Sequence, residues 1–254
     1  MKSRTFSLNS KVLTFCGHDD HYLDDLVENG ENVLEAFAKT QVPKNATILD
    51  IGANIGFVSS IFSIHNPDAT IYSLEPGLEN YNYLNKNIEF NELNNVIPLN
   101  IAASNENSVG SFHEFSAWGY LSSPDNNSSG SNLVKVQTID SLVEELGLKK
   151  IDLIKIDVEG FESQVFEGMR GTLSNFNPKV IFEFNSFCML AYGRRNPLQF
   201  LDFIDKSFRH IFRFSQEKNN ESLFEPVDRT NFGVQSLHIN IVRNASVDNF
   251  LAFN

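Results

Sequence analysis

The chain has 254 residues, 41% of them hydrophobic, which is enough for one large α/β domain or two small ones. Its 32 Asp and Glu residues oppose 20 Lys and Arg residues and give a formal net charge of −12. The apolar content excludes a mainly disordered protein, and the acidic balance argues against partners that need clustered cations, such as nucleic acids and anionic membrane surfaces.

No apolar run approaches the about 20 residues that cross a bilayer, and the first residues do not resemble a secretory signal. Cys16 and Cys188 are the two cysteines of the chain, lie far apart and predict no disulfide framework. We therefore expect a soluble cytoplasmic protein without a nucleic-acid or membrane partner. The sequence does not indicate an oligomeric state.

Short β-branched runs alternate with amphipathic helical segments from residue 47 onward. The predicted strands are 47–52, 70–75, 96–102, 151–160 and 179–185, and the predicted helices are 55–65, 78–90 and 161–169. Residues 210–215 and 237–243 are predicted as late strands, the last of them antiparallel. This strand-then-helix repetition predicts an α/β fold with a mostly parallel sheet and helices on both faces.

Two regions interrupt the alternation. Residues 104–133 are rich in Ser, Asn and Gly around a short SFHEF segment, which predicts a mobile insertion over a site. Residues 1–46 precede the first core strand and predict a small strand followed by a helix. We therefore expect one domain over residues 47–254 with an N-terminal extension.

The segment ILDIGANIGF predicts a strand that ends at Asp50 and a tight turn that contains Gly52, Asn54 and Gly56. Glycine accepts positive φ angles and lets the backbone approach a ligand closely. A dinucleotide site has the pattern G-x-G-x-x-G, whose backbone amides hold a pyrophosphate. Here the third glycine is missing and an acid leads the turn, which would repel pyrophosphate but suits the ammonium group of S-adenosylmethionine.

Glu75 ends the next predicted strand, in SLEP. In Rossmann-type sites an acid about 20 residues after the glycine turn holds the ribose hydroxyls. Either motif alone is also explained by a tight strand-to-helix turn or by a solvated acid at a strand end. Because both occur on consecutive strands, the sequence predicts S-adenosylmethionine rather than NAD as the cofactor.

ILDIGANIGF, SLEP, LNIAAS and LIKIDVEGFE resemble, in order and spacing, the FkbM-type S-adenosylmethionine-dependent methyltransferases, over about residues 12–210. The resemblance implies a class I methyltransferase fold, with a mostly parallel seven-stranded sheet whose last strand is antiparallel. It also implies O-methylation of a hydroxyl, often on a sugar or a glycosylated natural product. By resemblance, Gly52, Asn54 and Gly56 line the methionine half of the cofactor, Glu75 holds the ribose, and Asn100 and Ile101 contact the adenine.

The acids of DVEGFE lie at the end of the fourth predicted strand and the start of the next helix. Asp157 could hold the acceptor hydroxyl, and Glu159 could take its proton as a general base. For Glu162 the simpler interpretation is an acid that offsets the helix dipole. Lys155 is either paired with an acid or extends to the sheet edge.

Two groups of residues are candidates for a metal site. The run from His18 to His21 reads HDDH, although such acidic stretches are more often solvated. Glu183 and Asn185, with Asp157, could offer hard oxygen ligands to Mg²⁺. Polar residues at strand ends are commonly caps, so we predict no metal site.

The predicted insertion contains further candidates. His113 is an alternative base, and Trp118 and Tyr120 either stack on a sugar ring or anchor the loop. Arg194 and Arg195 would have to face the acceptor for it to carry phosphate. We therefore expect an uncharged, hydroxyl-rich acceptor on a sugar, a glycan or a glycosylated metabolite.

The sequence also bears on other functions. No Pro-Pro pair and no Pro-Cys pair occurs, which disfavours amino-methylation and cytosine C5-methylation of nucleic acids. Methylation of a protein or of another small molecule remains open. The missing third glycine disfavours a nicotinamide-dependent oxidoreductase, and the acids at 50, 75, 157 and 159 disfavour a non-catalytic module.

Overall fold

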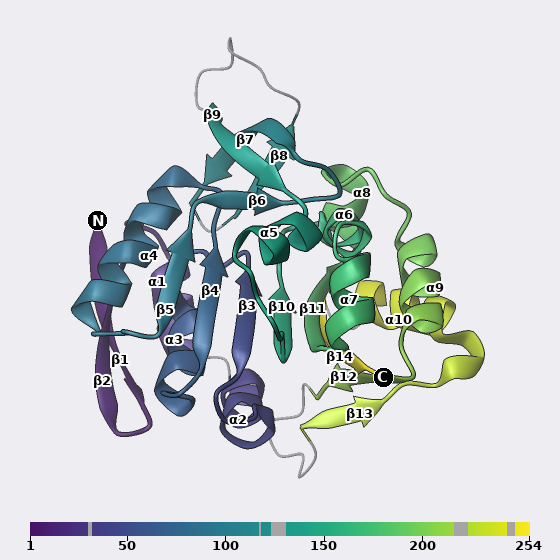
Figure 1. The fold of residues 1–254 in the computed structure, drawn as a ribbon, viewed down its shortest axis with the longest axis horizontal. Coiled ribbons are helices and arrows are strands. Elements are labelled where there is room, and N and C mark those ends of the chain that lie inside the picture. The colour runs from purple at the N-terminus through teal and green to yellow at the C-terminus, as the bar shows by residue number, and fades with distance from the viewer. Residues whose placement is uncertain (30–31, 117, 123–130, 216–222, 243–246) are drawn as a thin grey trace. The chain divides into compact units, whose positions relative to one another are not determined.

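The computed structural model describes residues 1–29, 32–116, 118–122, 131–215, 223–242 and 247–254 (Figure 1). The chain divides into two compact units. The first unit contains residues 1–103 and 107–137, and the second contains residues 104–106 and 138–254.

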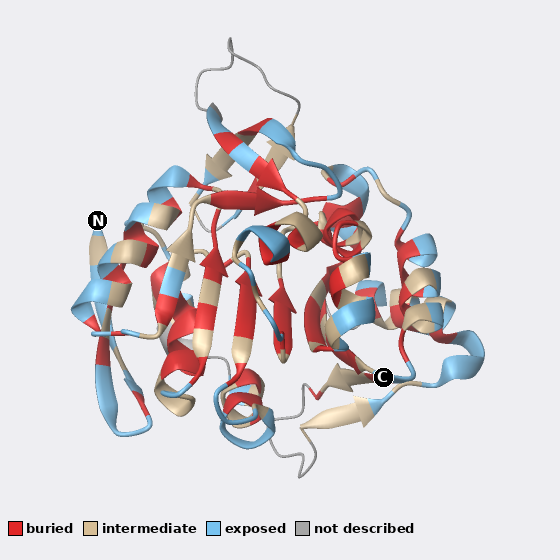
Figure 2. Cartoon of the chain, viewed as in Figure 1, coloured by how far each residue is buried: buried red, intermediate tan, exposed pale blue. Residues whose placement is uncertain are grey.

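The first unit contains three of the parallel strands that the alternating pattern predicts. They are β3 (Thr47–Ile51), β4 (Thr70–Leu74) and β5 (Val96–Leu99), with β4 in the middle. Four of the five residues of β3 are buried, as expected for a strand covered on both faces (Figure 2). The continuous apolar run therefore correctly predicted a buried parallel strand.

Helices connect these strands in sequence. Helix α3 (Phe57–His65) leads from β3 to β4, and helix α4 (Leu78–Phe90) leads from β4 to β5. Helix α3 buries Phe57, Ile61 and Phe62, the spacing of one apolar helix face. Both helices were predicted, and α4 begins and ends at the predicted residues.

The N-terminal segment contains more elements than predicted. Strands β1 (Lys2–Leu8) and β2 (Lys11–Gly17) form an antiparallel hairpin, and helices α1 (Tyr22–Asn29) and α2 (Asn32–Gln41) follow. One strand was expected here, because the turn at Asn9 and Ser10 was not recognised. Both turn residues have positive φ, 49° and 65°, as a two-residue hairpin loop requires.

Two asparagines of α4 pair with the edge of β2. The side chain of Asn87 accepts the N–H of Cys16 at 2.7 Å and donates to its C=O at 2.9 Å. Asn91 does the same with Thr14, at 2.7 and 2.8 Å. These amides satisfy backbone groups that an edge strand leaves without a neighbouring strand, so they fasten the hairpin to α4.

The predicted strand 96–102 is two strands in two sheets. Strand β5 ends at Leu99, and β6 (Ile101–Ala103) pairs with β9 (Ser131–Gln137) instead of β4. The side chain of Asn100 donates to the carbonyls of Glu75 and Pro76, at 2.8 and 3.1 Å. This contact diverts the chain, and a local hydrophobic pattern does not reveal it.

The predicted insertion is built from strands where the structure describes it. Strand β9 lies between β6 and β7 (Ser108–Phe115), and β8 (Trp118–Ser122) pairs with β7 at the edge. Phe112 and Leu121 pack against a small core of Ala102, Val134 and Val136. Residues 117 and 123–130 of the predicted mobile segment lie outside the described residues.

The second unit contains the remaining strands. Strands β10 (Leu153–Ile156) and β11 (Lys179–Asn185) are parallel, as predicted. The last strand, β14 (Val247–Phe253), is antiparallel to both β11 and β12 (His210–Phe214). The predicted fold class, with its antiparallel last strand, is confirmed. Within the described parts, the short β13 (Phe224–Pro226) beside β12 is one strand more than the seven predicted.

Phenylalanine rings form much of the core of the second unit. Phe166, Phe182, Phe200 and Phe250 are buried, and they form ring contacts with centroids 5.4–5.7 Å apart. Around this core lie α5 (Ile139–Glu145), α6 (Glu162–Glu167), α7 (Arg170–Phe176), α8 (Ser186–Ala191) and α9 (Pro197–Ser207). Edge-to-face and stacked rings account for the use of many of the 23 Phe residues.

The predicted strand at 237–243 is wrong. Its described residues belong to helix α10 (Phe232–Val242), whose residues Phe232, Ser236 and Asn240 are buried at intervals of four. The side chain of Asn240 donates to the carbonyl of Phe184 at 2.9 Å. The alternation of apolar and polar residues favoured a strand, but the burial of every fourth residue and the contact of Asn240 with β11 are those of a helix.

Candidate active site

The turn after β3 has the backbone conformation that its glycines predict. Gly52 and Gly56 have φ angles of 79° and 89°, and Asn54 between them has φ 52°. The N–H groups of Gly52 and Ala53 both donate to the carbonyl of Leu74, at 3.0 and 2.9 Å. Left-handed conformations favour glycine and tolerate asparagine, which explains this residue pattern.

Glu75 joins this turn to the one that follows β4. Its carboxylate accepts the N–H of Asn54 through Oε2 and the N–H of Gly77 through Oε1, both at 2.8 Å. Asn100 reaches the Glu75 carbonyl, and Ile101 follows it with 8% of its surface exposed. The first unit therefore brings together the residues predicted to line a cofactor from the methionine end to the adenine.

Asp50 lies behind the turn, fully buried. Its Oδ2 accepts the hydroxyl of Ser59 in α3 at 2.5 Å, and the Ser59 hydroxyl lies 2.7 Å from that of Ser73 in β4. Asp50 thus links α3 to its own strand β3 and, through the Ser59 hydroxyl, to β4. Sequence reasoning missed this structural role. Its contact with a cofactor ammonium group remains a prediction.

The acids of the second unit follow β10. The Lys155 ammonium lies 3.2 Å from Asp157 Oδ2, so of the two interpretations of Lys155 the paired one is correct. Glu159 has a positive φ of 52°, and the thiol of Cys188 donates to its Oε2 at 3.4 Å. Glu159 is therefore held in a conformation that non-glycine residues adopt only with strain.

Glu162 shapes the turn that carries Glu159. It is fully buried, and its Oε1 accepts the N–H groups of Val158 and Gly160, each at 3.2 Å. A Cβ at Gly160 would lie 2.4 Å from the Cys188 carbonyl, so this position requires glycine. Interpreting Glu162 only as a partner of the helix dipole missed this contact, although the E-G-x-E spacing could have indicated it.

Burial changes the protonation of these acids. It raises the pKa of Glu159 to about 7, with a contribution from the negative charge of Asp157. It raises the pKa of Glu162 to about 8. Burial and the neighbouring acids raise the pKa of Glu183 well above its ordinary value. A carboxyl group whose pKa lies near 7 can act as a general base at neutral pH.

The metal candidates have other contacts. Asn185 accepts the N–H of Cys188 and thereby caps α8. The His18 ring lies 3.0 Å from Asn80 Oδ1 and packs edge-on against Tyr83. Across the described ranges, no group of three or more His, Cys, Asp and Glu side chains is arranged to hold a metal ion.

The two candidate arginines are placed differently. Arg195 pairs with Glu167 at 3.1 Å, whereas Arg194 is exposed and has φ 51°. In the first unit, His113 Nε2 lies 2.9 Å from the Ser122 hydroxyl. Arg195 is therefore engaged within its own unit rather than held ready for a phosphate.

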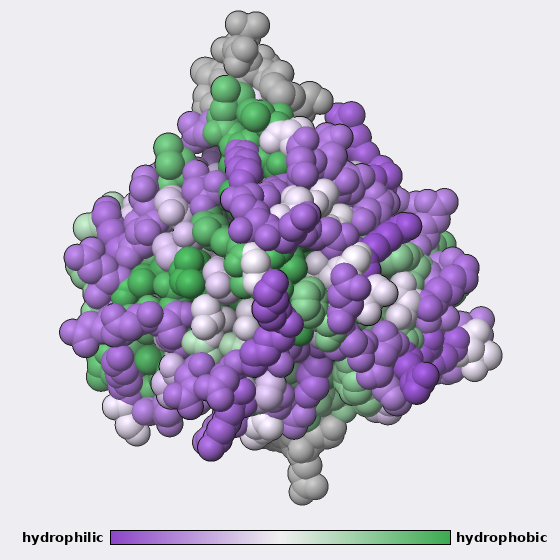
Figure 3. Space-filling model, viewed as in Figure 1, coloured by the Kyte–Doolittle hydropathy of each residue, from purple (hydrophilic) through white to green (hydrophobic). Residues whose placement is uncertain are grey.

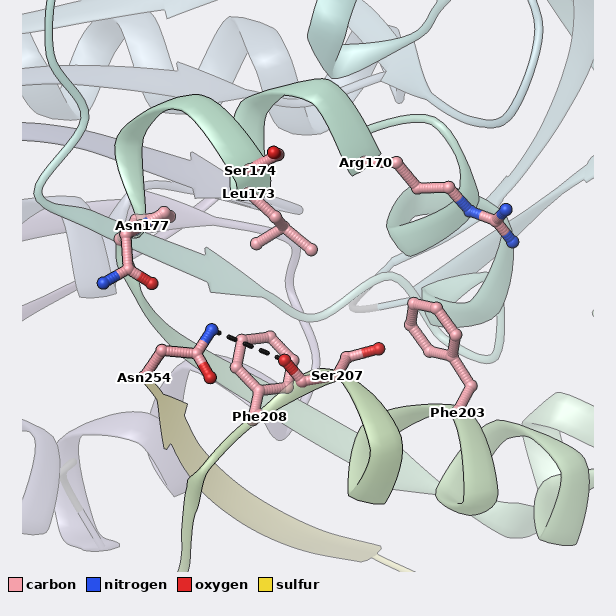
Figure 4. A pocket seen from close by; sticks show the side chains of 9 residues that line it. Arg170, Leu173, Ser174, Asn177, Phe203, Ser207, Phe208 and Asn254 are labelled. Atoms are coloured by element: carbon pink, nitrogen blue, oxygen red, sulfur yellow. Dashed lines mark hydrogen bonds between the residues drawn. The ribbon is translucent and has the colours of Figure 1, made fainter.

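A hollow of about 430 Å³ lies elsewhere in the second unit, between α7 and α9 (Figure 4). The Arg170 guanidinium lies 5.8 Å from the centre of the Phe203 ring, and Asn254 donates to the Ser207 carbonyl at 3.4 Å. None of the predicted site residues lines this hollow, so it is separate from the candidate active site.

Residues 50–222 match the family model of the methyltransferase FkbM domain, a stretch that contains both the glycine turn and the acids after β10. The chain belongs to this family. It is 28% identical over 152 residues to the hexuronic acid methyltransferase AglP of Haloferax volcanii, covering 60% of this chain and 62% of AglP. It is 30% identical over 144 residues to the 2-O-methyltransferase NoeI of Sinorhizobium fredii, covering 50% and 58%. Each match thus spans less than two thirds of the relative.

The fold of this FkbM-domain chain is similar to that of solved methyltransferases. Precorrin-6y C5,15-methyltransferase of Geobacter metallireducens superimposes with a TM-score of 0.50 and 11% identity, over 94% of this chain and 95% of that one. At this identity the likeness shows the fold alone. None of the helices in the described part of the chain is long and apolar enough to cross a membrane.

Proposed function

We propose that the chain is an S-adenosylmethionine-dependent O-methyltransferase that acts on a hydroxyl of a sugar, a glycan or a glycosylated metabolite. Membership of the FkbM family supports methyl transfer, and the two relatives are named for a hexuronic acid and for 2-O-methylation. The observation that carries the hydroxyl acceptor is Glu159, a strained and partly buried carboxyl group beside Asp157, with its pKa near 7.

In this proposal the first unit binds the cofactor. Gly52 and Gly56 have no side chains that would obstruct the turn, and their positive φ angles exclude most other residues. Asn54 lies between them, Glu75 offers a carboxylate to the ribose hydroxyls, and Asp50 supplies negative charge for the ammonium group. Asn100 and Ile101 would contact the adenine. Bound S-adenosylmethionine would supply an electrophilic methyl group.

The second unit supplies the acids that act on the acceptor. Asp157 holds the acceptor hydroxyl, and Glu159 takes its proton, so that the oxygen becomes a better nucleophile. Lys155, which is 7% exposed, stabilises the negative charge of Asp157 from 3.2 Å. General base catalysis of this kind contributes about 10²–10⁴-fold to a rate.

Two measurements test the proposal. Isothermal titration with S-adenosylmethionine and with NAD should show binding of the former only, and NAD binding alone would favour an oxidoreductase. Methyl transfer from labelled S-adenosylmethionine should then be measured with saccharides, a protein and RNA as acceptors. Transfer to the protein or to RNA, with none to saccharides, would contradict a sugar hydroxyl as the acceptor.

A further inference from the structure

Four aromatic side chains lie on one face of the β7–β8 hairpin in the first unit. His113 stacks on Tyr120 with centroids 4.6 Å apart, and Phe115 stacks on Trp118 at 4.9 Å. Phe115 is also nearly parallel to Tyr120, at 6.3 Å. The two close pairs are directly opposite residues of the ladder between β7 and β8. We call His113, Phe115, Trp118 and Tyr120 the aromatic ladder.

The aromatic ladder is on the solvent side of its sheet. Phe112 and Leu121, which alternate with the ladder residues, pack into the small core on the opposite face. Phe115 is 49% exposed and Trp118 is 39% exposed. In Figure 3 hydrophobic surface gathers over the β7–β9 sheet. Contiguous exposed apolar patches on a protein surface often mark interaction sites.

Contacts on the opposite face hold the β7–β8 hairpin in place. Glu114, between two ladder residues, accepts the N–H groups of Glu79 and Asn80 at the start of α4, at 3.1 and 2.7 Å. The Phe112 ring lies over Gly119, where a Cβ would be 2.5 Å from the ring. These contacts fix the backbone on which the ladder stands, so the rings are held in place before a ligand arrives.

The charge of the ladder face differs from that of the whole chain. The described positions on this face are 109, 111, 113, 115, 118, 120, 122, 133 and 135, and none of them is Asp or Glu. Lys135 and His113 are on this face, while the Glu114 carboxylate is on the other. In a chain with a net charge of −12, this face suits a neutral or an anionic ligand rather than a cationic one.

We propose that the aromatic ladder binds the saccharide part of the acceptor. One face of a pyranose ring presents C–H groups that pack on the exposed parts of aromatic rings, such as those of Phe115 and Trp118, while its hydroxyls remain at the edge for water and for polar side chains. The two stacked pairs are displaced along the strands by about 7 Å, which favours a ligand of at least two sugar units. The identity of this ligand as the methyl acceptor rests on the proposed function.

Trp118 makes the proposal directly testable, because it is the one tryptophan of the chain. Its fluorescence emission is measured while the full chain is titrated with mono-, di- and tetrasaccharides, both neutral and uronic-acid-containing. We expect a saturable change that is tighter for disaccharides and longer chains. Tyr120→Ala and Phe115→Ala should weaken binding at least tenfold. Phe90→Ala, which removes a 57% exposed ring of the same unit, should leave it unchanged.

The outcomes separate this proposal from the proposed function. Saccharide binding without methyl transfer would support the aromatic ladder as a saccharide site and contradict the proposed function. Methyl transfer to a saccharide with a KM that Tyr120→Ala does not change would support the proposed function and contradict the aromatic ladder as the acceptor site. Titrations in which no saccharide changes the emission would overturn the ladder proposal. A change in emission that depends on protein concentration alone, together with a dimer in sedimentation, would assign the ladder to a second copy. Circular dichroism confirms that each variant is folded.

Discussion

The carboxylate of Glu75 accepts the backbone N–H of Asn54 at 2.8 Å, and this hydrogen bond joins the two turns that the sequence identifies as separate motifs. The other oxygen of the same carboxylate accepts the N–H of Gly77. Glu75 is 5% exposed, so both bonds are shielded from water. A side chain expected only to hold a ribose therefore also determines the shape of the glycine turn.

Glu75→Ala should weaken S-adenosylmethionine binding about ten- to hundredfold, because hydrogen bonds to a charged group contribute about 1.5–3 kcal/mol. Glu75→Gln should have an intermediate effect. Its remaining oxygen can still accept one backbone N–H, but its side-chain NH₂ group would face the other backbone N–H, which is also a donor. Isothermal titration measures both affinities. Glu89→Ala removes an exposed carboxylate of α4 and serves as the control. Unchanged affinity in a folded Glu75→Ala protein would remove Glu75 from the site.

Gly52→Val should abolish cofactor binding while the protein stays folded with a lower Tm. Gly52 has φ 79°, where a side chain costs about 1–2 kcal/mol, and a branched residue would also obstruct the turn. Gly147→Ala is a matched control, because Gly147 has φ 63° and no atom within 4 Å of an added Cβ. If Gly52→Val binds S-adenosylmethionine as the wild type does, the glycine turn is not the cofactor site.

The sequence predicted those elements whose stability is local or set by a simple pattern. The buried strand over 179–185 and the helix over 78–90 were found at their observed ends, since each has the apolar pattern of its type. The glycine turn and Glu75 were also found, because positive φ angles and strand ends leave a clear mark in the residue types. How these motifs contact one another could not be predicted.

Two of the errors share a physical cause, which is a contact between residues distant in the chain. Asn100 ends β5 through carbonyls that lie about 25 residues earlier, and Asn240 fixes α10 through a carbonyl of β11. The error at Glu162 is of another kind, because its backbone partners, Val158 and Gly160, lie only four and two residues earlier in the turn. Polar side chains that bind distant backbone groups leave no periodic pattern in the sequence.

Asp157→Asn and Glu159→Gln should each lower kcat by about 10²–10⁴-fold and leave S-adenosylmethionine affinity nearly unchanged. A base must be deprotonated to act, so wild-type turnover should rise as the pH passes the Glu159 pKa of about 7. That rise should be absent from the residual activity of Glu159→Gln. Asp152→Asn, which changes an acid before β10 rather than after it, is the control. Full turnover in either active-site variant excludes that residue from the chemistry.

Glu162 should make the protein less stable as the pH rises. Burial raises its pKa from 4.5 to about 8, so between these values the folded state holds a proton that the unfolded state has lost. The free energy of unfolding should therefore fall over this range, by at most about 1.4 kcal/mol per pH unit for one group. Glu159 and Glu183 act in the same direction, since their pKa values are also raised.

Glu162→Gln, which does not titrate, should flatten this dependence, and Glu144→Gln on the exposed face of α5 should not. Urea unfolding at several pH values between 5 and 9 gives the slopes. Equal slopes for wild type and Glu162→Gln would mean that Glu162 is charged in the folded state at neutral pH.

Asn87→Ala should destabilise the first unit by about 2–4 kcal/mol. Asn87 is 1% exposed, and its amide bonds both backbone groups of Cys16 and the carbonyl of Ile55. The alanine variant leaves these buried groups without partners, at about 1–3 kcal/mol for each unsatisfied group. Because Ile55 follows Asn54 in the glycine turn, S-adenosylmethionine affinity should also fall several-fold.

Asn94→Ala, at an exposed position after α4, should change stability by less than about 0.5 kcal/mol. Equal unfolding midpoints in urea for the two variants would show that these amide contacts do not hold the β1–β2 hairpin to α4.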